Sequence, residues 1–272
     1  MIENKDTIAF IVEGEAREPL IIQNISNIYF KHSNFQIITL PAGQNIYMLW
    51  QTLQEDDFET DIIEVLRESS KELQKILAPY TRDNFSEVYL FFDYDGHQNN
   101  LTTEERSLDT VMRMLEDFDN ETENGKLYIS YPMVEALRDF YPQQCGSQTG
   151  CFCQLCEFAN YKDTSASGEC YTDFRKYSFE IWQMLISTFI MKVSCLLEQE
   201  KCISFEEYRM KVTPITIYEY QNTYINLDQI FILSAFPEFL LDYFKQDFWN
   251  KTVQYASLRP YHCQKEDVKN EM

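Results

Sequence analysis

Four acidic side chains follow apolar, strand-like runs, and their types and spacing could do chemistry. They are Glu13, Asp93, Asp95 and Glu135. Carboxylates that lie close together repel one another and raise one another's pKa, so a cation is their natural neutralising partner. Ligand sets made only of oxygen favour Mg²⁺ or Mn²⁺. The pattern therefore predicts a divalent-metal site, provided that the fold brings these segments together.

The segments that must position these acids alternate between strand and helix. Continuous apolar runs predict buried strands at residues 7–12, 35–40, 88–92 and 126–131. Apolar residues at helical spacing predict helices after Pro19, at about 45–54 and 60–78, and after a capping-box pair at Thr102 and Glu105. This alternation indicates an α/β domain with a mainly parallel sheet over residues 1–140. The carboxyl ends of its strands would share one edge, where the acids would meet.

The remaining residues, 141–272, are expected to be mostly helical. The expected segments are a long helix over 172–200, one begun by a capping box at Ser204 and Glu207, and one over 227–248 that Pro237 interrupts. Tyr and Phe recur along the last part at spacings of three and four residues. Such spacing favours helix packing or a homodimer interface over a surface that stacks nucleobases.

Composition and charge argue against several classes of function. The 272-residue chain has 23 Lys and Arg against 44 Asp and Glu, which gives a formal net charge of −21. Such a surface repels phosphate backbones, so a nucleic-acid substrate would need bound metal, a local basic patch or a basic partner. Neither a G-x-G-x-x-G string nor a P-loop string occurs, which argues against an ATPase.

We expect a cytoplasmic protein without a membrane span. The first residues lack the basic flank, apolar run and cleavage site of a signal peptide. The most apolar later stretch, residues 186–197, is short for a span and contains Lys192. In a reducing compartment the eight cysteines would be thiols or metal ligands rather than disulfides.

A cluster of cysteines forms a separate candidate site. Cys145, Cys151, Cys153 and Cys156 could enclose a structural Zn²⁺, and the last two have the usual Cys-x-x-Cys spacing. The alternative is a buried segment with inert thiols, because apolar residues are interleaved with these cysteines.

Two stretches resemble the Toprim domain, whose pattern is a strand ending in Glu-Gly and a later strand ending in Asp-x-Asp. They are Ile-Val-Glu-Gly-Glu-Ala-Arg-Glu-Pro at 11–19 and Leu-Phe-Phe-Asp-Tyr-Asp at 90–95. With Glu18 and the later Tyr-Pro-Met-Val-Glu at 131–135, the chain is similar to compact Toprim nucleases of bacterial anti-phage loci, such as RloB-like proteins and the AriB effectors of PARIS systems. The resemblance covers about residues 7–140.

The resemblance implies a nuclease that hydrolyses phosphodiester bonds of DNA or RNA, tRNA included, with Mg²⁺ or Mn²⁺. Glu13 would be a metal ligand or general acid/base, and Asp93 and Asp95 would be the metal-binding pair. It also implies a toxic effector of anti-phage defence that an associated ATPase sensor controls.

Three further residues match the family pattern more loosely. Glu18 and Glu135 would add metal ligands, and Glu135 is also a catalytic candidate. The commonest pattern has an Asp three residues after the Gly, where this chain has Arg17. This departure leaves the number of metal ions open, and Arg17 would instead offset negative charge on the reacting phosphate.

Two other functions compete for the same residues. Asp93-Tyr94-Asp95-Gly96 also resembles the nucleophile motif of haloacid-dehalogenase phosphatases, in which the first Asp attacks phosphorus. Those enzymes normally place the motif near the N-terminus, and no convincing Gly-Asp-x-x-x-Asp follows it here. Alternatively, the acidic domain would mimic nucleic acid or dock a basic partner without catalysis.

Overall fold

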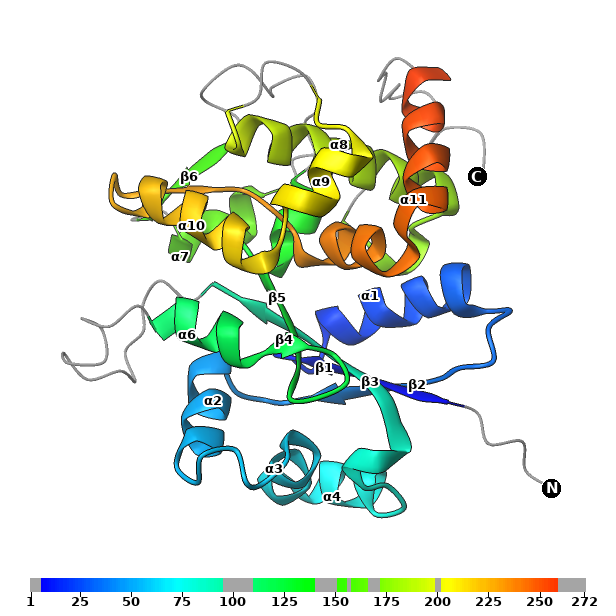
Figure 1. The fold of residues 1–272 in the computed structure, drawn as a ribbon, viewed down its shortest axis with the longest axis vertical. Helices are drawn as coiled ribbons and strands as arrows, with labels where there is room; N and C mark the ends of the chain where they lie inside the picture. The colour runs from blue at the N-terminus through cyan, green and yellow to red at the C-terminus, as the bar shows by residue number, and fades with distance from the viewer. Residues whose placement is uncertain are drawn as a thin grey trace.

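A five-stranded sheet lies at the centre of the first half of the chain (Figure 1). The computed structural model describes residues 6–94, 110–139, 151–155, 158–165, 172–198 and 202–258. The strand order is β2-β1-β3-β5-β4, and only the β4–β5 pair is antiparallel. The strands are β1 (Thr7–Val12), β2 (Gln36–Pro41), β3 (Phe85–Asp93), β4 (Asp119–Asn120) and β5 (Gly125–Ser130). The predicted α/β fold with a mainly parallel sheet and a helical C-terminal region is confirmed.

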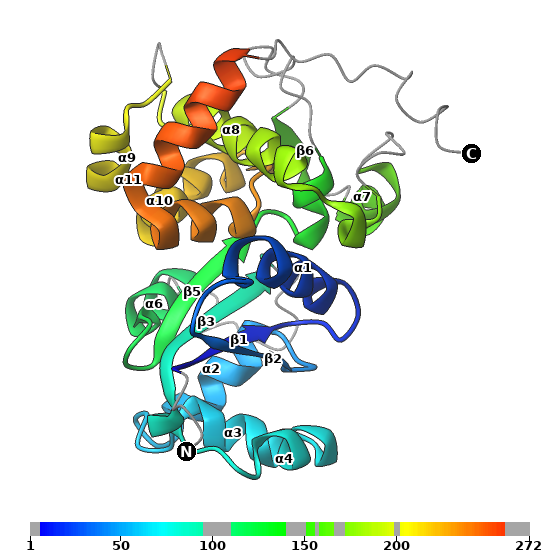
Figure 2. The same cartoon turned by 90° about the vertical axis from the view of Figure 1, so that its right-hand side faces the viewer.

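Helices lie on both sides of this sheet. In Figures 1 and 2, α1 lies between the sheet and the C-terminal helices, and α2, α3 and α4 lie on the opposite side. The helices of the first half are α1 (Arg17–Ile25) with its π-helical extension η1 (Ser26–Phe30), α2 (Ile46–Gln54), α3 (Ile62–Ser69), α4 (Lys71–Leu77), α6 (Thr110–Asp117) and the 3₁₀ turns η2 (Arg82–Asn84) and η3 (Val134–Arg138). The second half has α7 (Phe158–Thr164), η7 (Phe174–Lys176), α8 (Phe179–Leu196), α9 (Phe205–Lys211), α10 (Pro214–Ile225), α11 (Ala235–Leu258) and an antiparallel pair of strands, β6 (Phe152–Gln154) and β7 (Gln229–Phe231).

Aromatic side chains of β1, β3 and β5 cover one face of the sheet, and α11 closes that face. Phe10 and Phe91 are stacked with ring centroids 5.8 Å apart, and Phe91 and Tyr128 with centroids 5.7 Å apart. Phe239 of α11 meets these three rings and Tyr89 edge-on. A helix from the end of the chain thus completes the core of a sheet built at its beginning.

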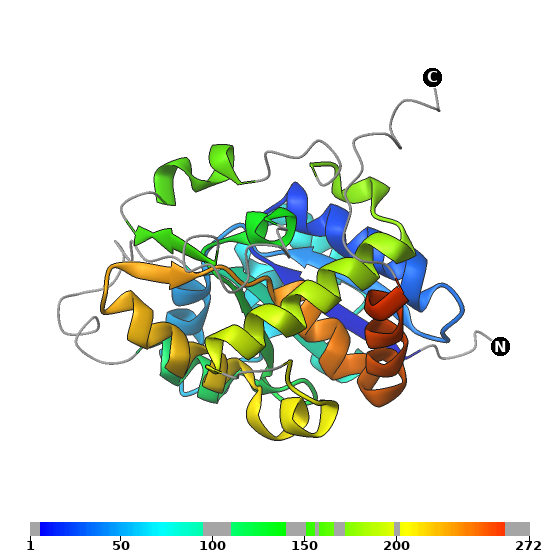
Figure 3. The same ribbon diagram turned by 90° about the horizontal axis from the view of Figure 1, so that it is seen from above.

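A buried asparagine ties α1 to the helices stacked above it. The Asn24 amide donates to Tyr177 O at 3.0 Å and accepts from Trp182 Nε1 at 2.7 Å. Figure 3 shows α8, which carries Trp182, crossing above the sheet domain. One hydrophobic cluster includes residues of the sheet and of these C-terminal helices. The predicted domain boundary at residue 140 lies outside the described residues and stays a prediction.

Several expected helices differ from the structure in extent. The segment 60–78 forms two helices because Ser70 is extended between them, with its side chain accepting from Leu73 N to cap α4. The long helix begins at Phe179 rather than at 172, after Ser178 as N-cap.

The expected helix over 227–248 is wrong in its first part, because residues 229–231 form β7 and α11 begins at Ala235. The predicted break at Pro237 is also wrong. Pro237 lies in the first turn of α11, where a helix needs no N–H from that residue. The backbone departs from helical geometry at Lys245 instead, with φ 58° and ψ −146°. The capping box at Ser204 and Glu207 is confirmed, and the Thr102–Glu105 pair lies outside the described residues.

Among the described helices, α8 alone is long and apolar enough to cross a membrane by length and composition. However, 67% of it is buried within the protein, as in the core helix of a globular fold. The expected cytoplasmic location stays a prediction.

Candidate active site

The carboxyl ends of β1 and β3 lie side by side, which brings two of the predicted acids together. Val12 pairs with Phe91, and the next residue, Glu13, donates its N–H to Phe91 O at 3.2 Å. Asp93 ends β3, and its N–H donates to Glu13 Oε2 at 3.1 Å. The backbone of one acidic residue therefore orients the carboxylate of the other.

A third acid reaches this edge from the first turn of α1. Glu18 is 7% exposed, and its Oε1 accepts from Gly14 N at 3.3 Å. A Cβ atom at position 14 would lie 2.9 Å from Glu18 Oε2, so glycine leaves the space that this carboxylate occupies. The loop after β1 is thereby shaped to hold Glu18 against it.

The three acids interact electrostatically at Asp93. Burial, together with the negative charges of Glu13 and Glu18, raises the pKa of Asp93 well above its usual range. A hydrogen bond from Val134 N–H and the positive charge of Lys162 act in the opposite direction. Negative charge is thus concentrated at the end of β3, and a proton or a cation would relieve it.

Basic side chains adjoin the acids on the same edge. Arg17 forms an ion pair with Glu135, whose side chain is 2% exposed, while that of Arg17 is 35% exposed. Burial and the charge of Arg138 lower the pKa of Arg17, whereas Glu18 and Asp93 act to raise it. Glu135 is therefore placed behind Arg17 as its buried partner.

Two of the cations at this edge, Arg138 and Lys162, are not among the residues predicted from the sequence. Arg138 donates to Ser165 Oγ and to Lys162 O, which holds the end of α7 against η3. Arg138 follows Glu135 by three residues. Side chains at this spacing lie on the same side of a 3₁₀ turn, so the spacing indicates that Arg138 lies beside Glu135. Lys162 carries no such signal because it belongs to a distant segment that only tertiary packing brings to Asp93.

The carboxylates are held by protein donors in this structure. In the described part of the chain, no group of three or more His, Cys, Asp or Glu side chains is arranged to hold a metal ion. The donor chemistry of Glu13, Glu18 and Asp93 nevertheless fits an oxygen-preferring ion, and burial together with the charges of Glu13 and Glu18 raises the pKa of Asp93. Of the other two predicted ligands, Glu135 forms an ion pair with Arg17, and Asp95 lies outside the described residues.

Half of the predicted zinc site can be described. Cys151 and Cys153 are buried, beside and within β6 respectively. Cys145 and Cys156 lie outside the described residues, so structural zinc stays a prediction.

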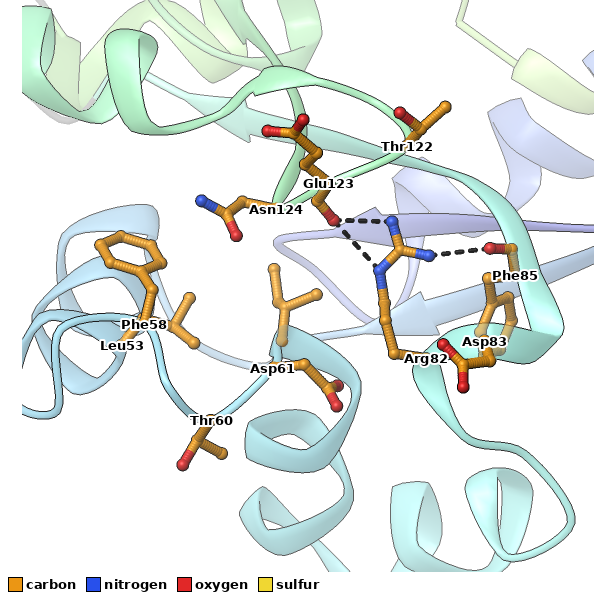
Figure 4. Close-up of a pocket in the computed structure, with 11 residues that line it drawn as sticks. Leu53, Phe58, Thr60, Asp61, Arg82, Asp83, Phe85, Thr122, Glu123 and Asn124 are labelled. Atoms are coloured by element: carbon orange, nitrogen blue, oxygen red, sulfur yellow. Dashed lines mark hydrogen bonds between the residues drawn. The ribbon is translucent and has the colours of Figure 1, made fainter.

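A pocket of about 430 Å³ lies at the opposite edge of the sheet, before β3 and beside the β4–β5 turn (Figure 4). Its arginine, Arg82, donates to Glu123 O at 2.6 and 3.1 Å and to Phe85 O at 2.8 Å. Asp61 accepts two N–H groups from the first turn of α3. Both residues thus stabilise the fold, and none of the predicted site residues that can be described lines this pocket.

No protein-family model, curated protein or solved structure matches the chain. The site at the carboxyl edge is therefore interpreted from its own geometry and charges.

Proposed function

We propose that this protein is a Toprim-type, metal-dependent nuclease with its active site at the carboxyl edge of the sheet. The observation that carries the proposal is the crowding of Glu13 and Glu18 around Asp93, with cationic side chains beside them. Hydrolysis of a phosphodiester needs both acidic and basic side chains. Its negative oxygens require positive charge, and its hydrolysis requires an activated water.

At this edge the acidic residues would bind the metal ion and the basic residues would bind the substrate phosphate. Glu13, Glu18, Asp93 and Asp95 would hold Mg²⁺ or Mn²⁺, which supplies an activated water and neutralises charge on the phosphate when bound. Arg17 is exposed enough to reach a substrate phosphate, and its pairing with buried Glu135 limits where its guanidinium can go. Glu135 is thus a positioning residue in this scheme.

The substrate would be DNA or RNA, tRNA included. The role as an effector of anti-phage defence, with an ATPase sensor as partner, follows from the resemblance to Toprim nucleases of such systems. Lys162 and Arg138 support a polyanionic substrate because they add positive charge locally to a strongly acidic protein.

The test compares Asp93→Asn with Asp119→Asn, a matched change at an exposed acid on β4. We expect the wild type and Asp119→Asn to bind Mg²⁺ in calorimetric titration and to cleave labelled DNA or RNA. Asp93→Asn should lose cleavage by about 100-fold or more. Its unfolding temperature without metal should be equal or higher, because removing one of several clustered charges relieves repulsion.

Three results would count against the proposal. Full cleavage by Asp93→Asn would remove Asp93 from the mechanism. A phosphoaspartyl adduct on Asp93 of the wild type would favour the phosphatase alternative. Absence of both Mg²⁺ binding and cleavage in the wild type would favour the non-catalytic acidic protein.

A further inference from the structure

A second charged cavity lies between α9, α10, α11 and β5, and it shares no described residue with the candidate active site. Its volume is about 140 Å³. Phe205 and Tyr208 of α9 form part of its wall, and Glu238 and Asp242 line it from successive turns of α11. The cavity therefore combines an apolar wall with two acids.

Glu238 is the buried acid of this cavity. It is 4% exposed, and within the described ranges no group donates a hydrogen bond to its fully buried Oε1. The donors close to Glu238 bind Asp242 instead. Asp242 accepts a hydrogen bond from Tyr128 Oη at 2.6 Å and forms an ion pair with Lys126. A buried carboxylate is costly unless it is protonated or paired, so Glu238, which lines the cavity, can accept a cationic donor there once it has lost its proton.

Positive charge lies at the rim of the same cavity. Arg209 and Lys245 line it, and both are exposed. Lys245 has the positive φ of 58° noted above, a strained backbone conformation for a residue other than glycine. The basic side chains at the rim can therefore attract an anionic group of a ligand, while Glu238 in the interior can accept a hydrogen bond from a cationic group.

We infer that this cavity binds a small zwitterionic amine, with its ammonium group on Glu238 and its anionic group at Arg209 and Lys245. The rings of Phe205 and Tyr208 suit both a short alkyl chain and an ammonium group. At about 30 Å³ for each water-sized group, a cavity of this volume holds about five such groups, so only a small ligand fits. This inference is independent of the proposed nuclease activity.

The protonation of Glu238 sets the pH dependence of binding. Burial and the charge of Asp242 raise the pKa of Glu238 to about 8, and Lys126 acts in the opposite direction. The empty site therefore holds a proton at neutral pH, and an ammonium ligand must displace it. Affinity should rise as the pH increases from 6 to 9. The charged or titratable groups that face Glu238 are Asp242, Lys126, Tyr128, Tyr131, Tyr208, Arg209 and Lys245.

The tyrosines among these groups do not compete over this range. Burial raises the pKa of Tyr128, Tyr131 and Tyr208 well above the usual value, so they stay neutral between pH 6 and 9. The pH dependence of binding is therefore assigned to Glu238.

The experiment titrates the full chain with 4-aminobutyrate, butylamine and butyrate by calorimetry at pH 6, 7.5 and 9. We expect 4-aminobutyrate to bind, butylamine to bind more weakly and butyrate not to bind. Glu238→Gln keeps the shape but removes the charge, and it should weaken 4-aminobutyrate binding by roughly tenfold or more. Glu219→Gln, at an exposed position on α10 away from the cavity, should bind like the wild type.

A second variant tests the anionic half of the site without touching the core. Arg209→Ala removes an exposed side chain and should reduce the preference for 4-aminobutyrate over butylamine. The inference is overturned if 4-aminobutyrate does not bind the wild type at any of these pH values. It is also overturned if Glu238→Gln binds as well as the wild type, or if Arg209→Ala keeps the full preference.

Discussion

At the scale of single residues, burial decides which charged groups have unused binding capacity. Burial is the largest cause of the raised pKa both of Asp93 and of Glu238. Asp93 lies among other acids with cations close by, a setting that suits a metal ion and a phosphate. Glu238 has one acidic neighbour whose charge is already paired, a setting that suits a single cationic group. The same kind of side chain thus suits two different ligands.

Glu238 should make the stability of the empty protein depend on pH. Its ordinary pKa is 4.5, and in the folded protein it is about 8, so the folded state binds more protons between these values. This contribution to stability is full below pH 4.5 and is lost as the pH rises through 8. Between pH 6 and 9 the wild type should therefore lose roughly 2 to 3 kcal/mol relative to Glu238→Gln.

Urea unfolding of the two proteins at pH 6 and 9 measures this difference. The difference in unfolding free energy between the wild type and Glu238→Gln removes the contribution of titratable groups that both proteins share. Glu219→Gln serves as the exposed control. Parallel stability curves for the wild type and Glu238→Gln would show that Glu238 does not titrate in this range.

At the scale of elements, the second half of the chain supplies parts that the sheet lacks. α11 covers the aromatic face of the sheet through Phe239, and the segment that includes α7 brings Lys162 to Asp93. The ion pair of Lys126 in β5 with Asp242 in α11 joins the same two layers. Neither the core nor the candidate site is therefore complete within the first half alone.

Phe239→Ala tests this dependence. The ring is fully buried and contacts aromatic rings of three strands, so its loss removes apolar contacts and leaves a cavity. We expect a loss of about 3 to 5 kcal/mol in the free energy of unfolding by urea. Met210→Ala, at a side chain that is 70% exposed, should cost far less. Equal effects would mean that α11 does not stabilise the sheet.

At the scale of the whole molecule, a net charge of −21 opposes the local cations of the candidate site. Charge repulsion acts over the distance of the Debye length, so a polyanion meets the acidic surface before it reaches Arg17 and Lys162. A bound divalent ion would reduce this barrier at the site itself. Substrate binding and metal binding should therefore be coupled.

Nucleic-acid binding by the isolated chain should accordingly depend on divalent metal. We expect weak binding of labelled DNA and RNA in EDTA, because few phosphate counterions are released on such a surface. Binding should tighten when Ca²⁺ is present, as fluorescence anisotropy would show. Tight binding in EDTA would contradict this view of the surface.

The sequence by itself determined the four parallel strands of the sheet and the acids at its edge. Parallel strands are buried on both faces, so they appear as continuous apolar runs, and the runs at 7–12 and 88–92 lie within strands β1 and β3. An acid that directly follows such a run must lie at the carboxyl edge, which is why Glu13 and Asp93 could be placed together.

Only the tertiary structure decided the rest. The short strands β4, β6 and β7 have two or three residues each, and pairing with distant partners defines them rather than any local pattern. The packing of α7, α9 and α11 places Lys162 close enough to Asp93 to act on its pKa. It also buries Glu238 so that Oε1 has no hydrogen-bond donor among the described residues. Contacts between segments far apart in the chain depend on the whole fold, so no spacing in the sequence encodes them.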